Sequence, residues 1–352
     1  MGSIGSVWIV GAGGVGSVLG GRLEQARPGS VVFVDSWAEH VGHLREHGLT
    51  VSYPEGPVSV RPSALLFDEL SSHEEAPDLV VLAVKAYDTR RAVEAVKPFI
   101  GPSPILSLQN AINEDTIAQI AGIDRTIGGV CLYSAGLTGP GRAVQGSAGG
   151  KIIIGELDGT ISSRINEIAE FLSASVPVEL SEDIWSELWT KLVRNAMVNG
   201  LAALANLGMG DLVLVPGADQ ICIGLGSEAI RVAQAAGHGK IVTADLFDNP
   251  RECPVEWYLK PAGSTEREAL EQGFHDSWVP HPGVYPSMLQ DLRKGRPTEI
   301  EALNGYVSAK GRETNVPTPL NDALTELVLA ASATSSFGDV DGVVAPLLPL
   351  VS

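Results

Sequence analysis

Six residues near the start of the chain have the spacing of a phosphate-binding turn. They form the pattern G-x-G-x-x-G and are Gly11, Ala12, Gly13, Gly14, Val15 and Gly16. In such a pattern the first glycine permits a tight turn, the second lets the backbone approach a pyrophosphate, and the third lets the following helix pack closely on the strand. The amino end of that helix then attracts the phosphates. An apolar run, 7–10, precedes the turn and helically spaced apolar residues follow it, so the sequence predicts a dinucleotide site.

An acidic residue follows at the distance that ribose recognition requires. The apolar run 31–34 ends in Asp35, about 20 residues beyond the last glycine of the turn. A carboxylate in this place accepts hydrogen bonds from ribose hydroxyls and repels a 2′-phosphate. Residues 36–38 supply no cation to neutralise such a phosphate. We therefore expect NAD(H) to be favoured over NADP(H) as the cofactor.

A lysine and two asparagines form a candidate polar wall in the second half of the chain. Lys191, Asn195 and Asn199 follow one another at spacings of four in the stretch 184–207, where apolar residues repeat at helical spacing. Each step of four advances about 40° around an α-helix, so the three side chains share a sector of roughly 80°. Their neighbours are largely apolar, and burial lowers the pKa of a lysine, which lets it exchange a proton near neutral pH and act as a general acid. The alternative is a solvent-facing stripe, although such faces usually carry Glu as well as Lys, and this one carries no carboxylate.

Two further polar residues follow apolar, β-branched runs that predict buried strands. Lys85 follows the run 79–84, and Asn110 follows the run 105–108 and Gln109. In an open doubly wound sheet, ligands bind outside the carboxyl ends of the strands, so both side chains are candidates to line the cofactor site. Considered alone, a surface lysine and a turn asparagine would be the simpler interpretation.

Two expected helix starts carry the remaining candidates. Ser287 and Thr298 each begin a capping-box pattern, so helices are expected to begin at both. Ser287 would then cap its helix, and the amino end of a helix is also a site for a carboxylate. Glu299 would occupy the first turn of the next helix, where the macrodipole favours an acid.

Three histidines are candidate metal ligands. His40, His43 and His47 fall on one face of the helix expected after the second strand. No carboxylate or cysteine pattern in the sequence completes such a site. We therefore expect a solvated helix face and no metal.

The composition restricts the class of protein and its partners. The 352 residues are 44% hydrophobic and 19% charged, and Lys plus Arg number 24 against 42 Asp plus Glu, for a net charge of −18. No basic run is available to contact phosphates along a groove, so nucleic acid is not expected as a partner. An anionic substrate is still compatible with this charge, because a few buried cations set the field inside a cleft. No stretch reaches the ~20 apolar residues of a membrane span, so no membrane association is expected.

The cysteines indicate a reducing compartment. Cys131, Cys222 and Cys253 are far apart in the sequence and form no C-x-x-C pair. This spacing argues against a disulfide framework and against a zinc site. The N-terminus also lacks the charged and apolar regions of a secretory signal. A cytoplasmic location is therefore expected.

The order of the predicted elements divides the chain in two. Strand and turn patterns alternate with helices up to about 179–183, and helical patterns follow. We expect an α/β domain over 1–180 and a helical domain over 181–340, whose large apolar faces favour a homodimer.

The segment 239–286 is rich in proline and aromatic residues and is expected to be a lid or an interface element. The tail from Ser332 is expected to be ordered at most in part.

With these pieces in place, the chain resembles the ketopantoate reductase (2-dehydropantoate 2-reductase) family over nearly its full length. The matching residues are Gly11-x-Gly13-x-x-Gly16, Ala83-Val84-Lys85-Ala86, Gln109-Asn110, Leu188-Trp189-Thr190-Lys191-Leu192 with Asn195 and Asn199, and Ser287-Met288-Leu289-Gln290-Asp291 ahead of Thr298-Glu299-Ile300. The resemblance implies an N-terminal Rossmann domain with a doubly wound parallel sheet. It also implies a C-terminal all-helical domain like that of 6-phosphogluconate dehydrogenase, which serves substrate binding and dimerisation, and an active site in the cleft between the two.

The resemblance also implies roles for the candidate residues. Lys191 would be the general acid, and Glu299 would orient Lys191 or a substrate hydroxyl. Lys85 and Asn110 would line the nicotinamide side of the site. The carboxylate and oxygen atoms of the substrate would be held by Asn195, Asn199 and Ser287.

The activity implied is hydride transfer from a nicotinamide to the C2 ketone of a 2-oxo acid such as 2-dehydropantoate, a step of pantothenate biosynthesis, while Lys191 protonates the developing alkoxide. Two features depart from the family: Asp35 stands where a basic residue usually meets NADPH, and 239–286 looks longer than in compact members. An NAD-dependent D-2-hydroxyacid dehydrogenase is therefore an alternative, as is an imine or 3-hydroxyacid oxidoreductase acting on a bulkier substrate. A non-catalytic dinucleotide-sensing module is a third alternative, although such a module would need no proton donor.

Overall fold

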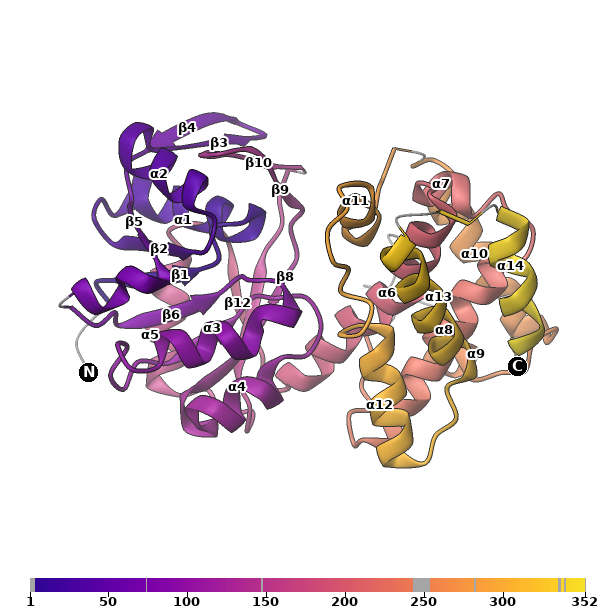
Figure 1. Cartoon of the computed structure of the whole chain (residues 1–352). Helices are drawn as coiled ribbons and strands as arrows, with labels where there is room; N and C mark the ends of the chain where they lie inside the picture. The colour runs from indigo at the N-terminus through magenta and orange to yellow at the C-terminus, as the bar shows by residue number, and fades with distance from the viewer. Residues whose placement is uncertain are drawn as a thin grey trace. The chain divides into compact units, whose positions relative to one another are not determined.

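Two units make up the chain, and Figure 1 shows them as an α/β unit and an all-helical unit. They are Met1–Leu188 and Trp189–Ser352, so the division falls inside the helix α6 (Ile184–Ala205). This computed structural model describes residues 4–73, 75–146, 148–242, 254–281, 283–334, 337–338 and 340–351. The predicted fold class, a Rossmann parallel sheet followed by an all-helical domain, is confirmed. The domain limits 1–180 and 181–340 stay a prediction.

One large sheet forms the centre of the first unit. Its strands are β1 Val7–Val10, β2 Val31–Asp35, β5 Ser63–Leu66, β6 Leu79–Leu82, β7 Ile105–Ser107, β8 Thr126–Cys131, β11 Ile152–Glu156 and β12 Val178–Leu180. Their order is β12-β11-β8-β7-β6-β1-β2-β5. The strands from β8 to β5 run parallel, whereas β11 pairs antiparallel with β8 and parallel with β12. The central parallel strands are short and almost wholly apolar, as expected for strands that are covered on both faces.

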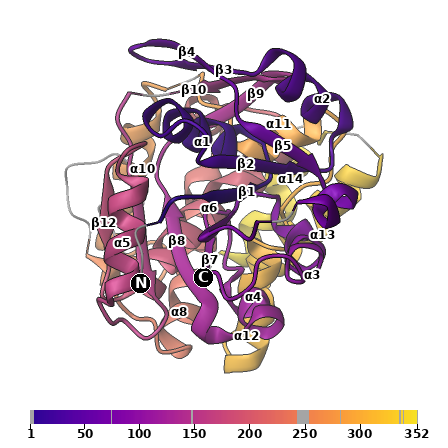
Figure 2. The same ribbon diagram turned by 90° about the vertical axis from the view of Figure 1, so that its left-hand side faces the viewer.

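Helices cover both faces of this sheet. They are α1 Gly14–Ala26, α2 Ala38–His47, α3 Thr89–Val96, α4 Glu114–Ala121 and α5 Ser163–Leu172, with the short 3₁₀ helices η1 Phe67–Ser72, η2 Ala86–Asp88 and η3 Ile123–Arg125. Val7 and Ile9 of β1 belong to a core shared with α1 and α5. Trp8 and Val10 point to the other face and belong to a core shared with α3 and α4. Figure 2 shows these two pairs of helices on opposite sides of the sheet.

A second, four-stranded sheet was not predicted from the sequence. Its strands are β3 Leu49–Tyr53, β4 Gly56–Val60, β9 Ala135–Gly139 and β10 Arg142–Gln145, in the order β4-β3-β10-β9. β3 and β10 pair parallel although they lie far apart in the chain. The sheet packs on α1, where the Tyr53 hydroxyl donates to Val18 O at 2.8 Å. Local sequence patterns do not reveal the pairing of two strands that lie so far apart in the chain.

A helix that is buried on all sides forms the centre of the second unit. Besides α6, the elements of this unit are α7 Met209–Leu212, α8 Ala218–Ala235, α9 Val255–Tyr258, α10 Thr265–Trp278, α11 Ser287–Arg293, α12 Asn304–Thr314, α13 Pro319–Thr334, α14 Val340–Leu347 and the 3₁₀ helix η5 Leu348–Leu350. In α8, Ile221, Cys222 and Ile223 have no exposed surface, and the helix contacts α9, α10, α12, α13 and α14. Among the helices that the structure describes, none is both long enough and apolar enough to cross a membrane.

Half of the described part of the segment 239–286 is helical, in α9 and α10. Tyr258 has no exposed surface and Trp278 is 8% exposed. Both helices pack on each other, and both contact α8. These two aromatic side chains therefore belong to the helical core, whereas Tyr285 is 43% exposed, and the role of the segment as a lid or an interface element stays a prediction. Residues 243–253 and 282 lie outside the described part of the chain.

Two helices lie in the described part of the chain's end. The helix α14 and the 3₁₀ helix η5 follow one another there, and α14 packs against α8 and α13. Val343 and Leu347 of α14 are buried. The sequence patterns did not predict these two helices; residues 335, 336, 339 and 352 lie outside the described part.

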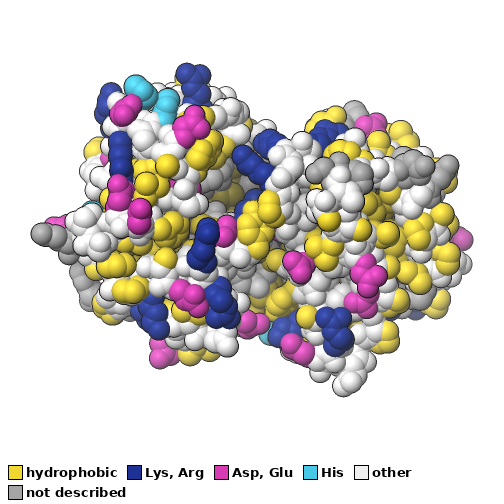
Figure 3. All heavy atoms as spheres, in the orientation of Figure 1, with side chains coloured by type: hydrophobic (Ala, Val, Ile, Leu, Met, Phe, Trp, Pro, Cys, Tyr) yellow, Lys and Arg dark blue, Asp and Glu magenta, His cyan; other side chains and the backbone are white. Residues whose placement is uncertain are grey.

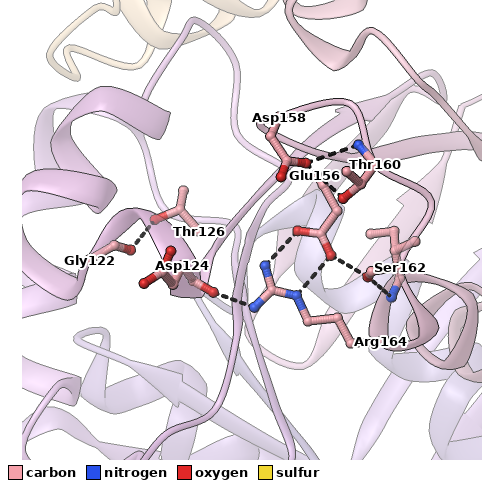
Figure 4. Close-up of polar contacts among 9 residues, drawn as sticks. Gly122, Asp124, Thr126, Glu156, Asp158, Thr160, Ser162 and Arg164 are labelled. Carbon is pink, nitrogen blue, oxygen red and sulfur yellow. Dashed lines mark hydrogen bonds and ion pairs between the residues drawn. The ribbon is translucent and has the colours of Figure 1, made fainter.

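An ion pair stabilises the edge of the large sheet at which the parallel strands begin (Figure 4). Arg164 of α5 donates to both oxygens of the Glu156 carboxylate and to the carbonyl oxygen of Asp124. Ser162, which caps α5, donates to the same carboxylate at 2.5 Å. Burial raises the pKa of Glu156, but the hydrogen bonds from Arg164 and Ser162 outweigh it, so the pKa lies below its usual value. The ionised carboxylate therefore holds β11 to α5.

We predict that Glu156→Gln lowers the free energy of unfolding by about 2 kcal/mol near neutral pH, because Arg164 loses its charged partner. Since the pKa is lowered in the folded state, the carboxylate stabilises the fold above its unfolded pKa of about 4.3, and this contribution is lost as the pH falls through the folded value. In urea unfolding, the difference between variant and wild type should therefore shrink with acid. Glu179→Gln, which breaks the exposed pair with Lys151, is the control and should cost less than about 1 kcal/mol. Equal losses in the two variants would contradict the prediction.

Candidate functional site

The segment that leads from β1 into α1 needs glycine at positions 11, 14 and 16 and leaves Gly13 open; at Gly14 a Cβ atom would lie 2.6 Å from Gly136 N. At Gly11 φ is +102°, and a Cβ atom there would lie 2.6 Å from Val84 N. A Cβ atom at Gly16 would lie 2.1 Å from Gly11 O, so only glycine lets α1 approach the turn this closely. At Gly13 a Cβ atom would meet nothing within 4 Å. The space beside Gly13, at the amino end of α1, is thus available to a phosphate group.

Asp35 connects the end of β2 to this turn. Its Oδ2 accepts a hydrogen bond from Ala12 N at 2.7 Å, and its Oδ1 accepts one from Trp37 N at 2.8 Å. The first turn of α1, all of it described, carries no acidic residue. A single carboxylate, fixed by two backbone donors, therefore stands beside the candidate phosphate site.

A hollow that is partly open to solvent lies beside Asp35. Its lining residues are Asp35, Ser36, Phe67, Val84, Asp88, Arg91 and Ala92. This hollow lies next to the residue expected to bind ribose, where the adenosine half of a dinucleotide would be placed. Sequence analysis missed Phe67, Asp88 and Arg91, because nothing in their local pattern relates them to β2.

Lys85 and Asn110 follow neighbouring strands of the sheet. The pairing of β1, β6 and β7 continues past the strand ends through Ala83 N to Val10 O at 2.8 Å and Leu108 N to Leu82 O at 2.9 Å. Lys85 and Asn110 come next in the chain, so the structure brings them to the edge that carries the glycine turn and Asp35. The candidate cofactor residues thus share the carboxyl edge of the parallel strands.

Lys191, Asn195 and Asn199 lie along α6, which is continuous from Ile184 to Ala205. Lys191 and Asn195 are half-buried, and Asn199 is 6% exposed. The flanking Leu192, Ala196 and Val198 are buried. The stripe is therefore not a solvent-facing one; it places an ammonium and two amides among apolar neighbours.

Glu299 is buried in a turn that packs on α6. The turn precedes α12, and Ile300 within it lies against α6, since a Cβ atom at Gly200 would be 3.0 Å from Ile300 Cδ1. The expected helix start at Thr298 is wrong: α12 begins at Asn304. The Asn304 side chain donates to Ala196 O at 2.9 Å, so this contact with α6 places the helix start later than the capping pattern indicates.

Ser287 is the exposed first residue of α11, where Pro286 occupies the cap position. The expected capping hydrogen bond from Ser287 is absent in this fully described helix. The other end of α11 is held near the end of α6, because Arg293 Nε donates to Asn206 Oδ1 at 2.7 Å. The hydroxyl of Ser287 therefore serves no capping role at the amino end of α11.

His40 corrects the prediction of a solvated histidine face. His40 has no exposed surface, stacks on Trp37 at 5.3 Å, and accepts a hydrogen bond from Gly141 N through Nδ1 at 2.9 Å. Burial lowers its pKa. His43 and His47 instead contact each other at 4.8 Å. Within the described residues no group of His, Cys, Asp and Glu side chains is arranged to hold a metal ion.

A dinucleotide turn on a parallel sheet, followed by a helical unit with a partly buried lysine, defines the class of NAD(P)-dependent oxidoreductases. Family models identify the class more narrowly. Residues 7–159 match Ketopantoate reductase PanE/ApbA, and residues 183–332 match Ketopantoate reductase PanE/ApbA C terminal. The chain belongs to the ketopantoate reductase family, as its motifs predicted.

Individual relatives match over almost their whole length. A 2-dehydropantoate 2-reductase from Lactococcus lactis is 32% identical over 329 residues, which cover 92% of this chain and 96% of the relative. D-mandelate dehydrogenase, solved with NADH and anilino(oxo)acetate, is 26% identical with a TM-score of 0.79, and the match covers 95% of this chain and 100% of that one. A ketopantoate reductase from Ralstonia eutropha JMP134 is 28% identical with a TM-score of 0.77, covering 94% and 99%. The prediction of a nicotinamide-dependent oxidoreductase is confirmed.

The glycine geometry gives a prediction that separates binding from folding. Gly13→Ala should leave the free energy of unfolding within about 0.5 kcal/mol of wild type, because the new methyl group meets no protein atom. It should weaken NADH binding on the order of 10-fold, because the methyl group occupies space offered to the phosphates.

Gly16→Ala is the matched control and should lower the free energy of unfolding by about 2 kcal/mol or more, because its methyl group meets Gly11 O. Fluorescence titration and urea unfolding measure the two effects. Unchanged NADH affinity in a folded Gly13→Ala protein would contradict the placement of the phosphates.

Proposed function

We propose that this protein reduces the C2 ketone of a 2-oxo acid such as 2-dehydropantoate, with a nicotinamide cofactor and with Lys191 as the general acid. The observation that supports it most directly is the stripe on α6, where a half-buried lysine precedes two amides by about one and two helical turns. Relatives named 2-dehydropantoate 2-reductase support the substrate. The glycine turn and Asp35 support the cofactor class.

The chemistry of each side chain suits the role proposed for it. The ammonium of Lys191 protonates the carbonyl oxygen as negative charge develops there, and neutral Lys191 accepts that proton in the reverse direction. The substrate carboxylate and its other oxygens are held by donors from Asn195, Asn199 and Ser287. A bound dihydronicotinamide supplies the hydride to C2.

Three further residues hold the reacting groups in place. Glu299, which is 4% exposed, orients the Lys191 ammonium or a substrate hydroxyl. The turn that carries Glu299 packs on α6, and this packing fixes the position of the Glu299 carboxylate along α6. On the cofactor side, Lys85 and Asn110 line the nicotinamide end of the glycine-turn site.

We also propose that NAD(H) is preferred over NADP(H). The carboxylate of Asp35 is fixed by Ala12 N and Trp37 N, and a 2′-phosphate would meet its negative charge. Arg91, a cation on the wall of the hollow beside Asp35, pairs with Asp88 at 3.1 Å, so its charge is partly balanced. The D-mandelate dehydrogenase that shares this fold was solved with NADH.

A comparison of kcat/KM for the two nucleotides tests this preference. We predict that NADH exceeds NADPH by about 10-fold or more in the wild type, because only the phosphorylated ribose is repelled by Asp35. Asp35→Ala should narrow the ratio, mainly by raising kcat/KM for NADPH. Glu39→Ala, which removes an exposed acid from the first turn of α2, is the control and should leave the ratio unchanged. A wild type that prefers NADPH would contradict the proposal.

A second candidate function is NAD-dependent oxidation of a D-2-hydroxy acid with a larger side chain. D-mandelate dehydrogenase, which was solved with anilino(oxo)acetate, favours it, as does Asp35. The same catalytic set would serve both functions, because each is a hydride exchange at C2 of a short acid. Steady-state rates with 2-dehydropantoate beside branched and aromatic 2-oxo acids distinguish the two.

Lys191→Ala tests the general acid. We predict that kcat falls on the order of 10²-fold or more while NADH still binds, because the variant lacks the proton donor but keeps the glycine turn. Lys310→Ala on α12, which removes a lysine paired with Glu313, is the control and should leave kcat unchanged. Normal kcat in folded Lys191→Ala protein would contradict the assignment.

We propose a homodimer formed through the helical unit. Figure 3 shows hydrophobic side chains on the face that carries α13 and α14. Leu214 is 62% exposed, Leu329 39% and Leu348 37%, and Leu348 lies against the start of α8 at Gly217. A contiguous apolar patch on this face would be typical of an interface. Light scattering of the purified protein measures the mass, and a monomer at micromolar concentration would contradict the proposal.

We propose a cytoplasmic location on the basis of the thiols. Cys131 and Cys222 are buried and form no disulfide in the described part of the chain, and Cys253 lies outside it. Such cysteines are typical of proteins kept in a reducing compartment. Cell fractionation tests the location, and recovery in a secreted fraction would contradict it.

A further inference from the structure

The residue that follows Asn110 has a strained backbone. Ala111 has a φ of +65°, a left-handed conformation that is unfavourable for a residue with a side chain, and it is 7% exposed. Such a conformation persists only where the surroundings hold it, and strained residues of this kind concentrate at functional sites. Some contact near Asn110 must therefore fix the turn.

A chain of side-chain hydrogen bonds supplies that contact. Gln109 Nε2 donates to Val84 O at 2.9 Å and to Thr89 Oγ1 at 2.8 Å. Thr89 Oγ1 donates to Asn113 Oδ1 at 3.0 Å, and Asn113 Nδ2 donates to Asn110 O at 2.7 Å. The Gln109–Thr89–Asn113 network thus joins the carbonyl just before Lys85 to the carbonyl of Asn110 itself.

Burial makes this network stiff. Gln109 is 4% exposed, Thr89 2% and Asn113 6%, so a lost hydrogen bond leaves a buried polar atom without a partner. Next to it lies the carboxyl group of Glu114, which has no exposed surface and accepts from Asn113 N at 2.9 Å. Burial raises the pKa of Glu114 to about 7.

We propose that Thr89 is a positioning residue that, through Gln109 and Asn113, sets the spacing between Lys85 and Asn110 and so aligns the nicotinamide end of the cofactor site. The inference rests on the proposed function, in which Lys85 and Asn110 line that end. Thr89 holds the central place because its hydroxyl both accepts from Gln109 and donates to Asn113. A valine has the same shape and can do neither.

Thr89→Val is the test, and Thr126→Val is its matched control. Thr126 is equally buried, at 1% exposed, and its hydroxyl donates one hydrogen bond, to Gly122 O at 2.9 Å, at the other edge of the sheet (Figure 4). Both variants replace a buried hydroxyl by a methyl group. A difference in NADH binding between the two variants therefore reports the location of the lost hydroxyl and not a general loss of stability.

We expect Thr89→Val to lower kcat/KM and to weaken NADH binding, each on the order of 10-fold. Binding of ADP-ribose, which lacks the nicotinamide ring, should stay within about 2-fold of wild type, because the hydrogen bonds that fix Asp35, from Ala12 N and Trp37 N, do not involve Thr89. Thr126→Val should change neither affinity. Thr89→Ser, which keeps the hydroxyl, should restore NADH binding to near the wild-type value.

Three results would overturn the inference: equal NADH affinity in Thr89→Val and Thr126→Val, an equal loss of ADP-ribose and NADH binding in Thr89→Val, or no rescue by Thr89→Ser. A wild-type protein that binds neither NADH nor NADPH is a different result. That result would contradict the proposed function, and the role proposed for Thr89 would be contradicted with it. Wild-type NADH binding with any of the three results would overturn the role of Thr89 alone.

Discussion

The sharp bend at Gly11 is the constraint on which the arrangement of the first unit depends. The chain leaves β1 there with φ at +102° and runs directly against the backbone of Val84, so no side chain fits. Gly11 N donates to Val34 O, and the next amide, of Ala12, donates to the Asp35 carboxylate. The bend therefore brings the ends of three strands together while it leaves the amino end of α1 open beside Gly13. A dinucleotide site follows from this one turn of backbone.

The parts of the fold and of the candidate site that depend on local sequence could be predicted. The glycine pattern and the apolar runs gave β1, β2, β6 and β7 within about two residues, because short buried strands are marked by their own composition. Helical periodicity gave α6 from Ile184 onward and the common face of Lys191, Asn195 and Asn199. Each of these features belongs to a single strand or helix, so the sequence of that element is enough to predict it.

The features that sequence analysis missed depend on contacts between distant segments. His40 is buried, and Gly141, far along the chain, donates to its ring. The helix α12 begins at Asn304 and not at Thr298, because the Asn304 side chain bonds to α6. The Gln109–Thr89–Asn113 network joins residues from two strand ends and two helix starts, and no spacing in the sequence indicates that these side chains meet.

Transfer of deuterium from NADH carrying deuterium at both C4 positions to C2 of a 2-oxo acid tests the central claim most directly. The purified protein would be incubated with the labelled nucleotide and with 2-dehydropantoate or an aromatic 2-oxo acid, and the product examined by mass spectrometry and NMR. The account predicts a 2-hydroxy acid with deuterium at C2. Tight nucleotide binding without deuterium in any of the acids would contradict it, and would leave a dinucleotide-binding protein without this chemistry.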